Sequence, residues 1–544
     1  MNSPADHSQT SVLIVGGGLA GLSAAVFLAR LGVRPVLAER HPGTSIHPRA
    51  RGQNPVVMEA LRAAGIEDRI LAAGPTGANS LHIVIAESLT GQVYKEILAG
   101  EAPDFSAYSA APFGMASQER TEPILAARAR DLGADLRFNT TVEEISHDAG
   151  GVLAVLRDRA SGNREEVRAQ FLIGADGGRG SVREWAGIGT HGRGPLADHL
   201  SVVFEADLAG VLGDRKFALY HLAAGTFVTT DDPGRYNLVI NATPGATPDL
   251  ADLADRVRQA AGVPGLAVRV LDSMRFQSAV RVADSFSAGR MHLVGDAAHL
   301  MPPTGGQGGN LAIMDSYSLA WKLAAVLRGQ AGRGLLDSHD AERRPFDEVV
   351  VEQQYAQLIL RTAPDRADGT EAEPMDPATL LFGGRFPAGA VVSEPEDDGA
   401  TFEDPRVPTG RPGSRAAHVR LRCGERELST TDWFGTGFVL LAGSAGGRWA
   451  AAADGADGIA FHCVGGDEPA GGAGPLGGAG PLTDVDGAFC ARYGISSTDA
   501  VLIRPDGVIA WRSRELSSDA DPVAAISAAL DLVLCRHPAV VATT

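Results

Sequence analysis

The sequence has little of two things that bear on function, cysteine and net positive charge. Four cysteines occur among 544 residues, all in the last quarter of the chain, and none forms a Cys-x-x-Cys motif. We therefore expect no disulfide framework, no thiol redox centre and no bound metal. Lys and Arg number 48 against 66 Asp and Glu, which gives a formal net charge of -18. This negative field repels nucleic acid and anionic membranes, so neither is an expected partner.

A convincing membrane anchor is also lacking. The stretch SVLIVGGGLAGLSAAVFLA at 11–29 is uncharged and nearly long enough to span a bilayer. Its glycines, however, cluster as in a turn between a strand and a helix, and no basic segment precedes it. We therefore expect a cytoplasmic protein, and a chain of this length predicts two or three domains.

The glycine cluster has the spacing of a dinucleotide-binding turn. Gly16, Gly18 and Gly21 follow a strand predicted at 12–15 and open a helix predicted at about 21–31. The first glycine permits the tight turn, the second lets backbone approach a pyrophosphate, and the third lets helix and strand pack closely. The N-terminus of that helix favours an anion.

An acidic residue ends the second strand of this unit. Glu39 closes the strand predicted at 34–39, where its carboxylate can accept both ribose hydroxyls of a nucleotide. Gly-x-Gly-x-x-Gly alone would be a weak signal in a chain with 67 glycines, but strand, turn, helix, strand and acid in this order are specific. Because Glu39 would repel a 2′-phosphate, FAD or NAD is expected here rather than NADPH.

The hydrophobic pattern changes along the chain. Helical spacing at 58–69 follows the first unit, and alternating stretches between about 196 and 281 predict antiparallel strands. Helical spacing returns at about 310, where a long helix is predicted to end at Gly329. A polar, proline-bearing linker at about 363–377 precedes the strand-like pieces of a small α/β domain.

Two further predicted strands end in an acid beside a glycine. Asp176 follows the strand in FLIGADGG, and Asp296 follows the strand in MHLVGD. Each alone would be ordinary at a turn. Together with the N-terminal glycines, in this order and spacing over about the first 360 residues, they resemble the FAD-dependent aromatic hydroxylases of the para-hydroxybenzoate hydroxylase fold family. RGQNPVVMEALR at 51–62 and the C-terminal extension resemble the subgroup that acts on aromatic polyketides, anthracycline-type hydroxylases in particular.

This resemblance implies a fold of mixed α/β and α+β class. It comprises a Rossmann-like FAD-binding domain, an antiparallel-sheet substrate domain and a C-terminal thioredoxin-like domain. The expected boundaries are 1–75, 110–195 and 282–370 for the discontinuous FAD-binding domain, 76–109 and 196–281 for the substrate-binding domain, and 385–544 for the thioredoxin-like domain. Because the last has no Cys-x-x-Cys, disulfide exchange is not expected of it.

The resemblance also implies which residues hold FAD. Asp296 would contact the ribityl hydroxyls, Glu39 the adenosine ribose and Arg49 the pyrophosphate, although Arg51 lies close enough to leave that register open. Asp176 matches an aspartate that serves flavin and nicotinamide, and a surface ion pair with a nearby arginine is the alternative. The expected cofactor-binding residues are Gly16, Gly18, Leu19, Ala20, Gly21, Glu39, Arg40, Arg49, Gln118, Val142, Asp176, Asp296, Pro303, Gly308, Gly309 and Asn310.

The stretch GDAAHLMPPTGGQGGN at 295–310 gives up most of its side chains just before the long helix. The N–H groups of Gly309 and Asn310 at the helix start can point at the flavin N1 and C2 oxygen, where reduction places negative charge. A Cβ at Gly308 or Gly309 would hinder approach of the ring. The resemblance places the Pro303 carbonyl beside the reacting edge of the flavin.

The activity implied by the resemblance is monooxygenation. NADH or NADPH, bound transiently, would reduce FAD, and O2 would form a flavin C4a-hydroperoxide that hydroxylates a phenolic polycyclic substrate. The flavin carries this chemistry, so no side chain is assigned as catalytic. Tyr220 is the expected substrate contact, and His221 and Arg281 are further candidates for tuning the phenol. An antibiotic-inactivating or Baeyer–Villiger enzyme and a non-catalytic flavin-binding partner stay open as alternatives, and a monomer or homodimer is expected.

Overall fold

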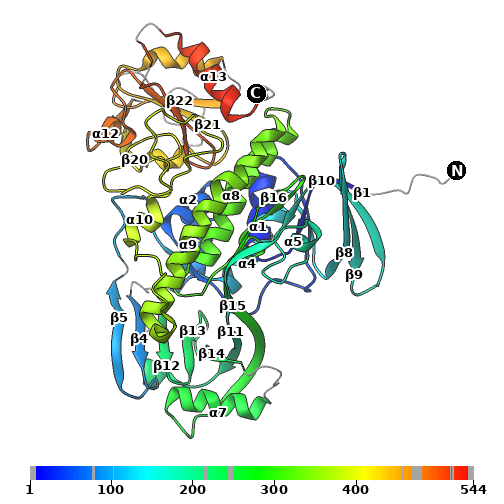
Figure 1. The fold of residues 1–544 in the computed structure, drawn as a ribbon. Helices are drawn as coiled ribbons and strands as arrows, with labels where there is room; N and C mark the ends of the chain where they lie inside the picture. The colour runs from blue at the N-terminus through cyan, green and yellow to red at the C-terminus, as the bar shows by residue number, and fades with distance from the viewer. Residues whose placement is uncertain are drawn as a thin grey trace, which may run out of the picture.

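Two long helices run side by side through the middle of the molecule, α8 (Gln307–Leu327) and α9 (Ser338–Thr362), with the C-terminal domain at one end and an antiparallel sheet at the other (Figure 1). The computed structural model describes residues 8–75, 80–101, 103–213, 217–242, 249–455, 458–466, 481–514, 516–517 and 520–536. The mixed α/β and α+β class expected from the sequence is confirmed.

The first sheet is built on parallel strands and contains the N-terminal βαβ unit. Its main order is β16-β17-β10-β1-β2-β7, in which β16 and β17 pair antiparallel and the other neighbours pair parallel. An antiparallel hairpin of β8 and β9 extends from β10. The strands are β1 (Ser8–Val15), β2 (Val36–Ala38), β7 (Asp135–Arg137), β8 (Thr140–Asp148), β9 (Gly151–Asp158), β10 (Arg164–Gly174), β16 (Ser287–Ala288) and β17 (Met291–Leu293).

The uncharged stretch 11–29 is explained by burial inside the protein. The VLIV run of β1 lies in the middle of the sheet and is buried on both faces, as a central parallel strand requires. Helix α1 (Leu19–Arg30) is buried from Leu19 to Ala29 because it packs between the sheet and α8. Within the described ranges, no helix combines the length and apolar character needed to cross a membrane.

The second sheet is long, twisted and almost entirely antiparallel. Its order is β18-β15-β11-β14-β13-β12-β4-β5, and β12 with β4 is the parallel pair. Residues before 102 and residues after 189 therefore share one sheet. The alternating pattern at 196–281 predicts the antiparallel strands of the second segment. The strands are β4 (Ser80–Ala86), β5 (Val93–Glu101), β11 (Thr190–Glu205), β12 (Phe217–Leu222), β13 (Gly225–Thr229), β14 (Arg235–Asn241), β15 (Arg269–Ala283) and β18 (His299–Leu300).

The helical spacing at 58–69 corresponds to two helices rather than one. Helix α2 (Pro55–Ala63) ends before Gly65, whose φ of +72° stops a right-handed helix, and α3 (Glu67–Ala73) begins beyond it. The Asn54 side chain caps α2 by accepting from the Val57 N–H at 2.9 Å. The short ladder of β3 (Arg51–Gln53) with β6 (Gly114–Ser117) lies next to these helices and leads into α4 (Gln118–Asp131).

The C-terminal domain is built on two small sheets. One has the order β20-β19-β23 and the other β22-β21-β24-β25. Their strands are β19 (Arg420–Cys423), β20 (Arg426–Ser429), β21 (Phe438–Ala442), β22 (Ile459–Cys463), β23 (Leu482–Asp484), β24 (Ala500–Ile503) and β25 (Ile509–Arg512). The remaining α-helices among the described residues are α5 (Val182–Trp185), α6 (Ala209–Leu212), α7 (Leu250–Ala261), α10 (Pro377–Phe382), α11 (Ala450–Asp454), α12 (Phe489–Tyr493) and α13 (Pro522–Val533).

Buried charges join this domain to the two long helices. Arg504 of the C-terminal domain donates to both carboxylate oxygens of Glu342 on α9, at 2.7 and 2.9 Å. Glu342 also accepts from Lys322 of α8 at 2.6 Å, and all three side chains are fully buried. The Tyr317 hydroxyl of α8 donates to the Pro505 carbonyl at 3.0 Å. The C-terminal domain is therefore tied directly to the helices that reach the cavity described next.

Candidate cofactor and substrate site

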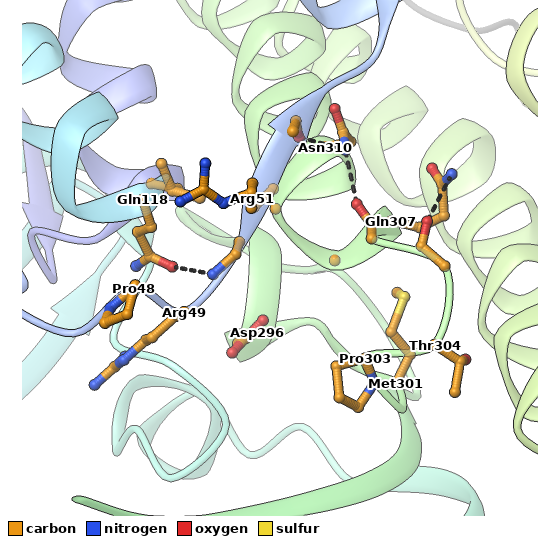
Figure 2. A pocket seen from close by; sticks show the side chains of 18 of the residues that line it. Pro48, Arg49, Arg51, Gln118, Asp296, Met301, Pro303, Thr304, Gln307 and Asn310 are labelled. Carbon is orange, nitrogen blue, oxygen red and sulfur yellow. Dashed lines mark hydrogen bonds between the residues drawn. The ribbon is translucent and has the colours of Figure 1, made fainter. Parts of the chain in front are cut away.

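A large cavity of about 3130 Å³ runs from the glycine turn after β1, past the start of α8, to one face of the antiparallel sheet. Figure 2 shows part of its wall, with Asp296 between Arg49 and Pro303 in this view. Among the expected cofactor residues, those lining it are Gly16, Gly18, Leu19, Ala20, Glu39, Arg40, Arg49, Gln118, Val142, Asp176, Asp296, Pro303, Gly308, Gly309 and Asn310. Gly21 lies behind this surface, in the packing of α1 against β1.

The three glycines of the turn meet different steric demands. Gly16 has a φ of +106°, and a Cβ there would lie 2.3 Å from the Ala175 carbonyl oxygen. A Cβ at Gly21 would lie 1.9 Å from the Gly16 carbonyl oxygen, so this position is closed to other residues by helix–strand packing. At Gly18, the N-cap of α1, the nearest atom would be 3.8 Å away, on Glu122. The backbone of Gly18 is thus open to the cavity, as approach of a pyrophosphate requires.

Glu39 lies beside this turn as well as at the cavity wall. Its carboxylate accepts from the Gly17 N–H at 2.6 Å and from the His41 N–H at 2.8 Å. One side chain therefore holds the glycine turn and the loop after β2, and it also presents negative charge to the cavity. Val142 of β8 lines the same end.

The geometry favours Arg49 over Arg51 as the residue that faces a bound anion. Arg51 is buried, forms an ion pair with Asp231, and donates to the Met115 carbonyl at 2.9 Å. Arg49 is exposed at the cavity wall and donates to the Met274 sulfur of β15 at 2.8 Å. Asp231 comes from the turn after β13. Both arginines line the cavity (Figure 2), but the Arg51 guanidinium is held by Asp231 and the Met115 carbonyl, whereas Arg49 is exposed there.

Gln118 is fixed as the first residue of α4. Its backbone N–H donates to the Ala50 carbonyl at 2.7 Å, and its side-chain oxygen accepts from the Ala50 N–H at 3.3 Å (Figure 2). Its side-chain amide donates to Glu122 at 2.6 Å. Glu122, absent from the expected set, also accepts from the Ser45 N–H at 2.7 Å, and burial raises the pKa of its carboxyl.

Asp176 is held by backbone rather than by an arginine. One carboxylate oxygen accepts from the Val182 N–H at 3.0 Å, and the other is buried with no partner within the described part of the chain. Burial raises the pKa of this carboxyl. Across the described residues, no ion pair within 4.0 Å joins it to Arg179 or Arg183, so the surface ion pair considered above does not form.

The stretch 295–310 forms the floor of the cavity. Gly295 turns with a φ of +61°, and the Asp296 carboxylate points into the cavity (Figure 2). Loss of water around the Asp296 carboxyl raises its pKa, and the positive charges of His299 and Arg49 oppose this rise. The adjoining loop, which carries Pro303, is fixed from α9: the Arg361 guanidinium donates to the Thr304 carbonyl at 2.7 Å. Arg361 lines the cavity and had no signal in the sequence.

Helix α8 begins at Gln307, three residues before the expected start. The backbone N–H groups of its first turn, Gln307 to Gly309, have no partner inside the helix, because a helix leaves its first N–H groups unpaired. Asn310 instead uses its side chain, which accepts from the Asn54 N–H at 2.9 Å and donates to the Gly306 carbonyl at 2.7 Å. That the N–H groups of Gly309 and Asn310 point at a bound flavin stays a prediction.

Gly308 and Gly309 differ in what surrounds them. A Cβ at Gly308 would meet nothing closer than the Met301 side chain at 4.0 Å, so it would project into the open cavity. A Cβ at Gly309 would lie 3.0 Å from Leu19 and 3.1 Å from Ala50. Glycine at 308 keeps space in the cavity, whereas glycine at 309 permits protein packing.

On the sheet side, Tyr220, the expected substrate contact, does not line the cavity, so this expectation is corrected. Tyr220 is 2% exposed and packs against Phe227, with ring centroids 6.2 Å apart, in the core behind the sheet. Successive residues of a strand point to opposite faces, so the neighbouring His221 is the one that lines the cavity. Burial, and then the charge of Arg361, lower the pKa of His221 to about 4, which keeps it neutral. Arg281 also lines the cavity and donates to the Gly178 carbonyl at 2.6 Å.

These features suit FAD specifically. A bare glycine turn at a helix N-terminus fits a pyrophosphate, and an acid after β2 fits a ribose. The cavity-facing carboxylate of Asp296 fits a polyhydroxylated chain, and the open space beside Gly308 fits a flat ring. One continuous cavity has a dinucleotide turn at one end and, at the other, a sheet face lined by both polar and apolar side chains, which gives room for a flavin and a second, organic ligand.

Comparison with known proteins agrees. The family described as "FAD binding domain" matches residues 9–354, and the family described as "Aromatic-ring hydroxylase, C-terminal" matches residues 409–535. The chain belongs to the FAD-dependent aromatic-ring hydroxylase family. It is 40% identical over 534 residues to aklavinone 12-hydroxylase RdmE of Streptomyces purpurascens, covering 95% of this chain and 97% of that protein.

Two further likenesses bear on function. A 4-methyl-5-nitrocatechol 5-monooxygenase of a Burkholderia species is 38% identical over 558 residues, which cover 97% of this chain and 98% of that protein. The crystal structure of aklavinone-11 hydroxylase with FAD and aklavinone superimposes with a TM-score of 0.88 at 38% identity, covering 98% of this chain and all of that one.

Proposed function

We propose that the protein is an FAD-dependent monooxygenase that hydroxylates a phenolic polycyclic compound of the aromatic polyketide class. The observation that carries this proposal is the continuity of the cavity, which joins the dinucleotide turn to the face of the antiparallel sheet past the start of α8. Family membership supports the cofactor and the reaction, and the likeness to aklavinone hydroxylases supports the substrate class.

The expected cofactor residues divide into three groups along the cavity. The turn at Gly16 to Gly21, with Arg49 opposite, would hold the pyrophosphate, and Glu39 would hold the adenosine ribose. Asp296 would hold the ribityl chain, with Gln118 nearby. When bound, FAD supplies the transfer of electrons from a nicotinamide and the activation of O2, chemistry that side chains do not provide.

The chain itself contributes electrostatics and exclusion of water. The N–H groups of the first turn of α8 would stabilise negative charge on the pyrimidine side of the reduced ring, because a helix N-terminus carries positive partial charge. Arg361 holds the Pro303 loop from the opposite side. Neutral His221 at the cavity wall can accept a hydrogen bond from a substrate hydroxyl.

The nicotinamide reductant would bind transiently, since the dinucleotide turn after β1 is assigned to FAD. We propose NADH or NADPH as the source of electrons and O2 as the oxidant. The proposed domain division is the discontinuous one stated from the sequence, with the C-terminal unit as a thioredoxin-like domain that lacks a redox motif.

A single-ring phenol is the second candidate substrate. The 4-methyl-5-nitrocatechol 5-monooxygenase shares 38% identity over nearly the full length of both chains, so overall similarity alone does not separate the two classes. Both classes are phenolic, and the same wall residues would serve either one.

The test is substrate-dependent oxygenation. The purified protein is expected to carry FAD, visible as a flavin absorbance spectrum, and to oxidise NADH or NADPH faster when a suitable phenol is added. Anthracycline-type aglycones and 4-methyl-5-nitrocatechol would be compared at equal concentrations, with product identified by the gain of one oxygen in its mass. Oxidation of the nicotinamide with no oxygenated product from any phenol would contradict the proposal, and product from the nitrocatechol alone would replace the polycyclic substrate with a single ring.

A further inference from the structure

A cluster of four buried charged side chains lies directly beneath the turn that presents Asp296. It consists of His299 from β18, Asp315 from α8, and Arg343 and Asp347 from α9, each at most 4% exposed. None of the four lines the cavity, so none can touch a ligand there directly.

Asp315 is the centre of this cluster and its link to the turn. One carboxylate oxygen accepts from the Gly295 backbone N–H at 2.9 Å and from His299 Nε2 at 2.9 Å. The other accepts from Arg343 at 2.8 Å. Arg343 in turn donates to Asp347 at 2.8 Å, so α8, α9 and the turn are joined through a single carboxylate.

Packing around Gly295 also limits how far the turn can move. Gly295 has a φ of +61°, and a Cβ on it would lie 2.9 Å from Ala20 and 3.1 Å from Ala312. It is therefore pressed between α1 and α8, and its N–H direction is set by the bond to Asp315. Asp296 is the next residue, so the bond to Asp315 and the packing around Gly295 together hold the backbone from which the Asp296 side chain projects.

The charges of the cluster favour the arrangement seen. Burial alone would lower the pKa of His299, but the negative charges of Asp315 and Asp347 raise it to about 9, so the imidazole is protonated at neutral pH. Burial would raise the pKa of Asp315, but Arg343 and His299 lower it, so this residue stays ionised. Asp315 thus meets two cations and one backbone N–H, which an uncharged side chain of the same size cannot do.

We propose that Asp315 is a positioning residue for FAD binding, which acts by fixing the Gly295–Asp296 turn so that the Asp296 carboxylate faces the ribityl chain. This inference rests on the proposed function, in which Asp296 contacts FAD. It assigns a cofactor-binding task to a side chain that never reaches the cofactor, and to the buried cations that hold that side chain.

The chain offers a matched control on the same two helices. Glu342 of α9 accepts from Lys322 of α8 and from Arg504, is fully buried, and does not line the cavity. Glu342→Gln therefore disturbs a buried ionic cluster of similar kind that has no contact with the Asp296 turn.

The experiment is a double-mutant cycle on FAD affinity. Asp296→Asn, Asp315→Asn and the double variant would be compared with Glu342→Gln, measuring the FAD dissociation constant by flavin fluorescence and thermal unfolding of the same full-length samples. We expect Asp296→Asn and Asp315→Asn each to weaken FAD binding about 10-fold or more, the range of a charge-assisted hydrogen bond. The double variant should be no more than about 2-fold weaker than Asp296→Asn alone, because the two residues act on one contact.

Each outcome has a defined meaning. Unchanged affinity in Asp296→Asn would overturn the placement of that residue and, with it, the proposed cofactor contact. Suppose that Asp296→Asn weakens FAD binding as expected, and that the double variant weakens it by the product of the two single effects. This result would overturn the positioning role of Asp315 alone. The positioning role would also be overturned if Glu342→Gln lowered FAD affinity and the unfolding temperature as much as Asp315→Asn does.

Should Asp315→Asn not fold, Asp347→Asn tests the same connection through Arg343. It is expected to weaken FAD binding less, by about 3-fold, and to have no further effect in the Asp296→Asn background. Additive loss in that background would likewise reject the inference.

Discussion

The Glu39 carboxylate accepts a hydrogen bond from the Gly17 backbone N–H at 2.6 Å, which joins the end of β2 to the glycine turn after β1. A Cβ at Gly17 would lie 2.8 Å from the Glu39 Cβ, so the two segments are in close contact. The acid therefore shapes the turn in addition to offering its charge to a ribose. Loss of the charge should affect both tasks together.

Glu39→Gln is expected to weaken FAD binding about 5-fold, because a bond to a carboxylate is worth roughly 1 kcal/mol more than one to a neutral amide. Flavin fluorescence during titration of the apoprotein measures the dissociation constant. Glu184→Gln is the control, since Glu184 is an exposed carboxylate that does not line the cavity. Wild-type affinity in Glu39→Gln would show that this carboxylate is not part of the cofactor site.

Gly308→Ala should separate cofactor binding from stability. The new methyl group meets only open space in the apoprotein, and alanine is favoured over glycine in a helix by about 1 kcal/mol, so resistance to urea should hold or rise. FAD affinity should nevertheless fall by about 10-fold or more because the methyl group takes up room in the cavity.

Gly309→Ala and Gly210→Ala complete this comparison. Gly309→Ala should lower apoprotein stability as well, since its Cβ would press on Leu19 and Ala50. Gly210, on α6, has open space around it and should leave FAD affinity unchanged. Loss of stability in Gly308→Ala with unchanged FAD affinity would place the ring elsewhere.

The parts of the fold with a local cause could be predicted from the sequence. The glycine turn, α1 and strands β1 and β2 depend on nearby residues: Gly16 needs a positive φ, and Gly21 needs to be bare against the Gly16 carbonyl. The break between α2 and α3 also has a local cause at Gly65, but a single glycine within a good helical pattern does not by itself mark a helix end.

The parts of the site that depend on distant pairing could not be predicted. Glu122 and Arg361 come from helices more than 200 residues apart, and only the packed structure shows that both line the cavity. The choice between Arg49 and Arg51 depends on Asp231, which lies 180 residues beyond Arg51. Alternation along β12 shows that Tyr220 and His221 face opposite ways, but only the packed sheet shows which face meets the cavity.

The Tyr220 and His221 pair provides a direct test of that orientation. Tyr220→Phe should leave the KM for the aromatic substrate within about 2-fold and cost roughly 1 kcal/mol of stability or less. His221→Phe should raise the KM about 10-fold through loss of a polar group at the cavity wall. Substrate-dependent NAD(P)H oxidation with product analysis gives both values. The opposite pattern, with Tyr220→Phe the damaging change, would mean that the strand faces the other way.

The pH dependence of unfolding should reveal the protonated His299. Burial opposes the charge, but the carboxylates of Asp315 and Asp347 raise the pKa of His299 to about 9 from the ordinary 6.5, and the carboxylate of Asp296 adds a further negative charge. A raised pKa means that the folded state binds the proton more tightly than the unfolded chain does. The stabilisation is thus complete below about pH 6.5 and is lost as the pH rises to about 9.

His299→Gln should remove this dependence while leaving a side-chain donor for Asp315. The difference in the free energy of unfolding between wild type and variant should shrink from pH 6.5 to 9, by at most about 1.4 kcal/mol per pH unit. Lys322, whose pKa burial lowers to about 8, acts with the opposite sign above that pH, but it is common to both proteins and cancels in the difference. Urea unfolding of both proteins at half-unit pH steps measures the difference in the free energy of unfolding. A constant difference from pH 6.5 to 9 would mean that His299 is neutral in the folded protein.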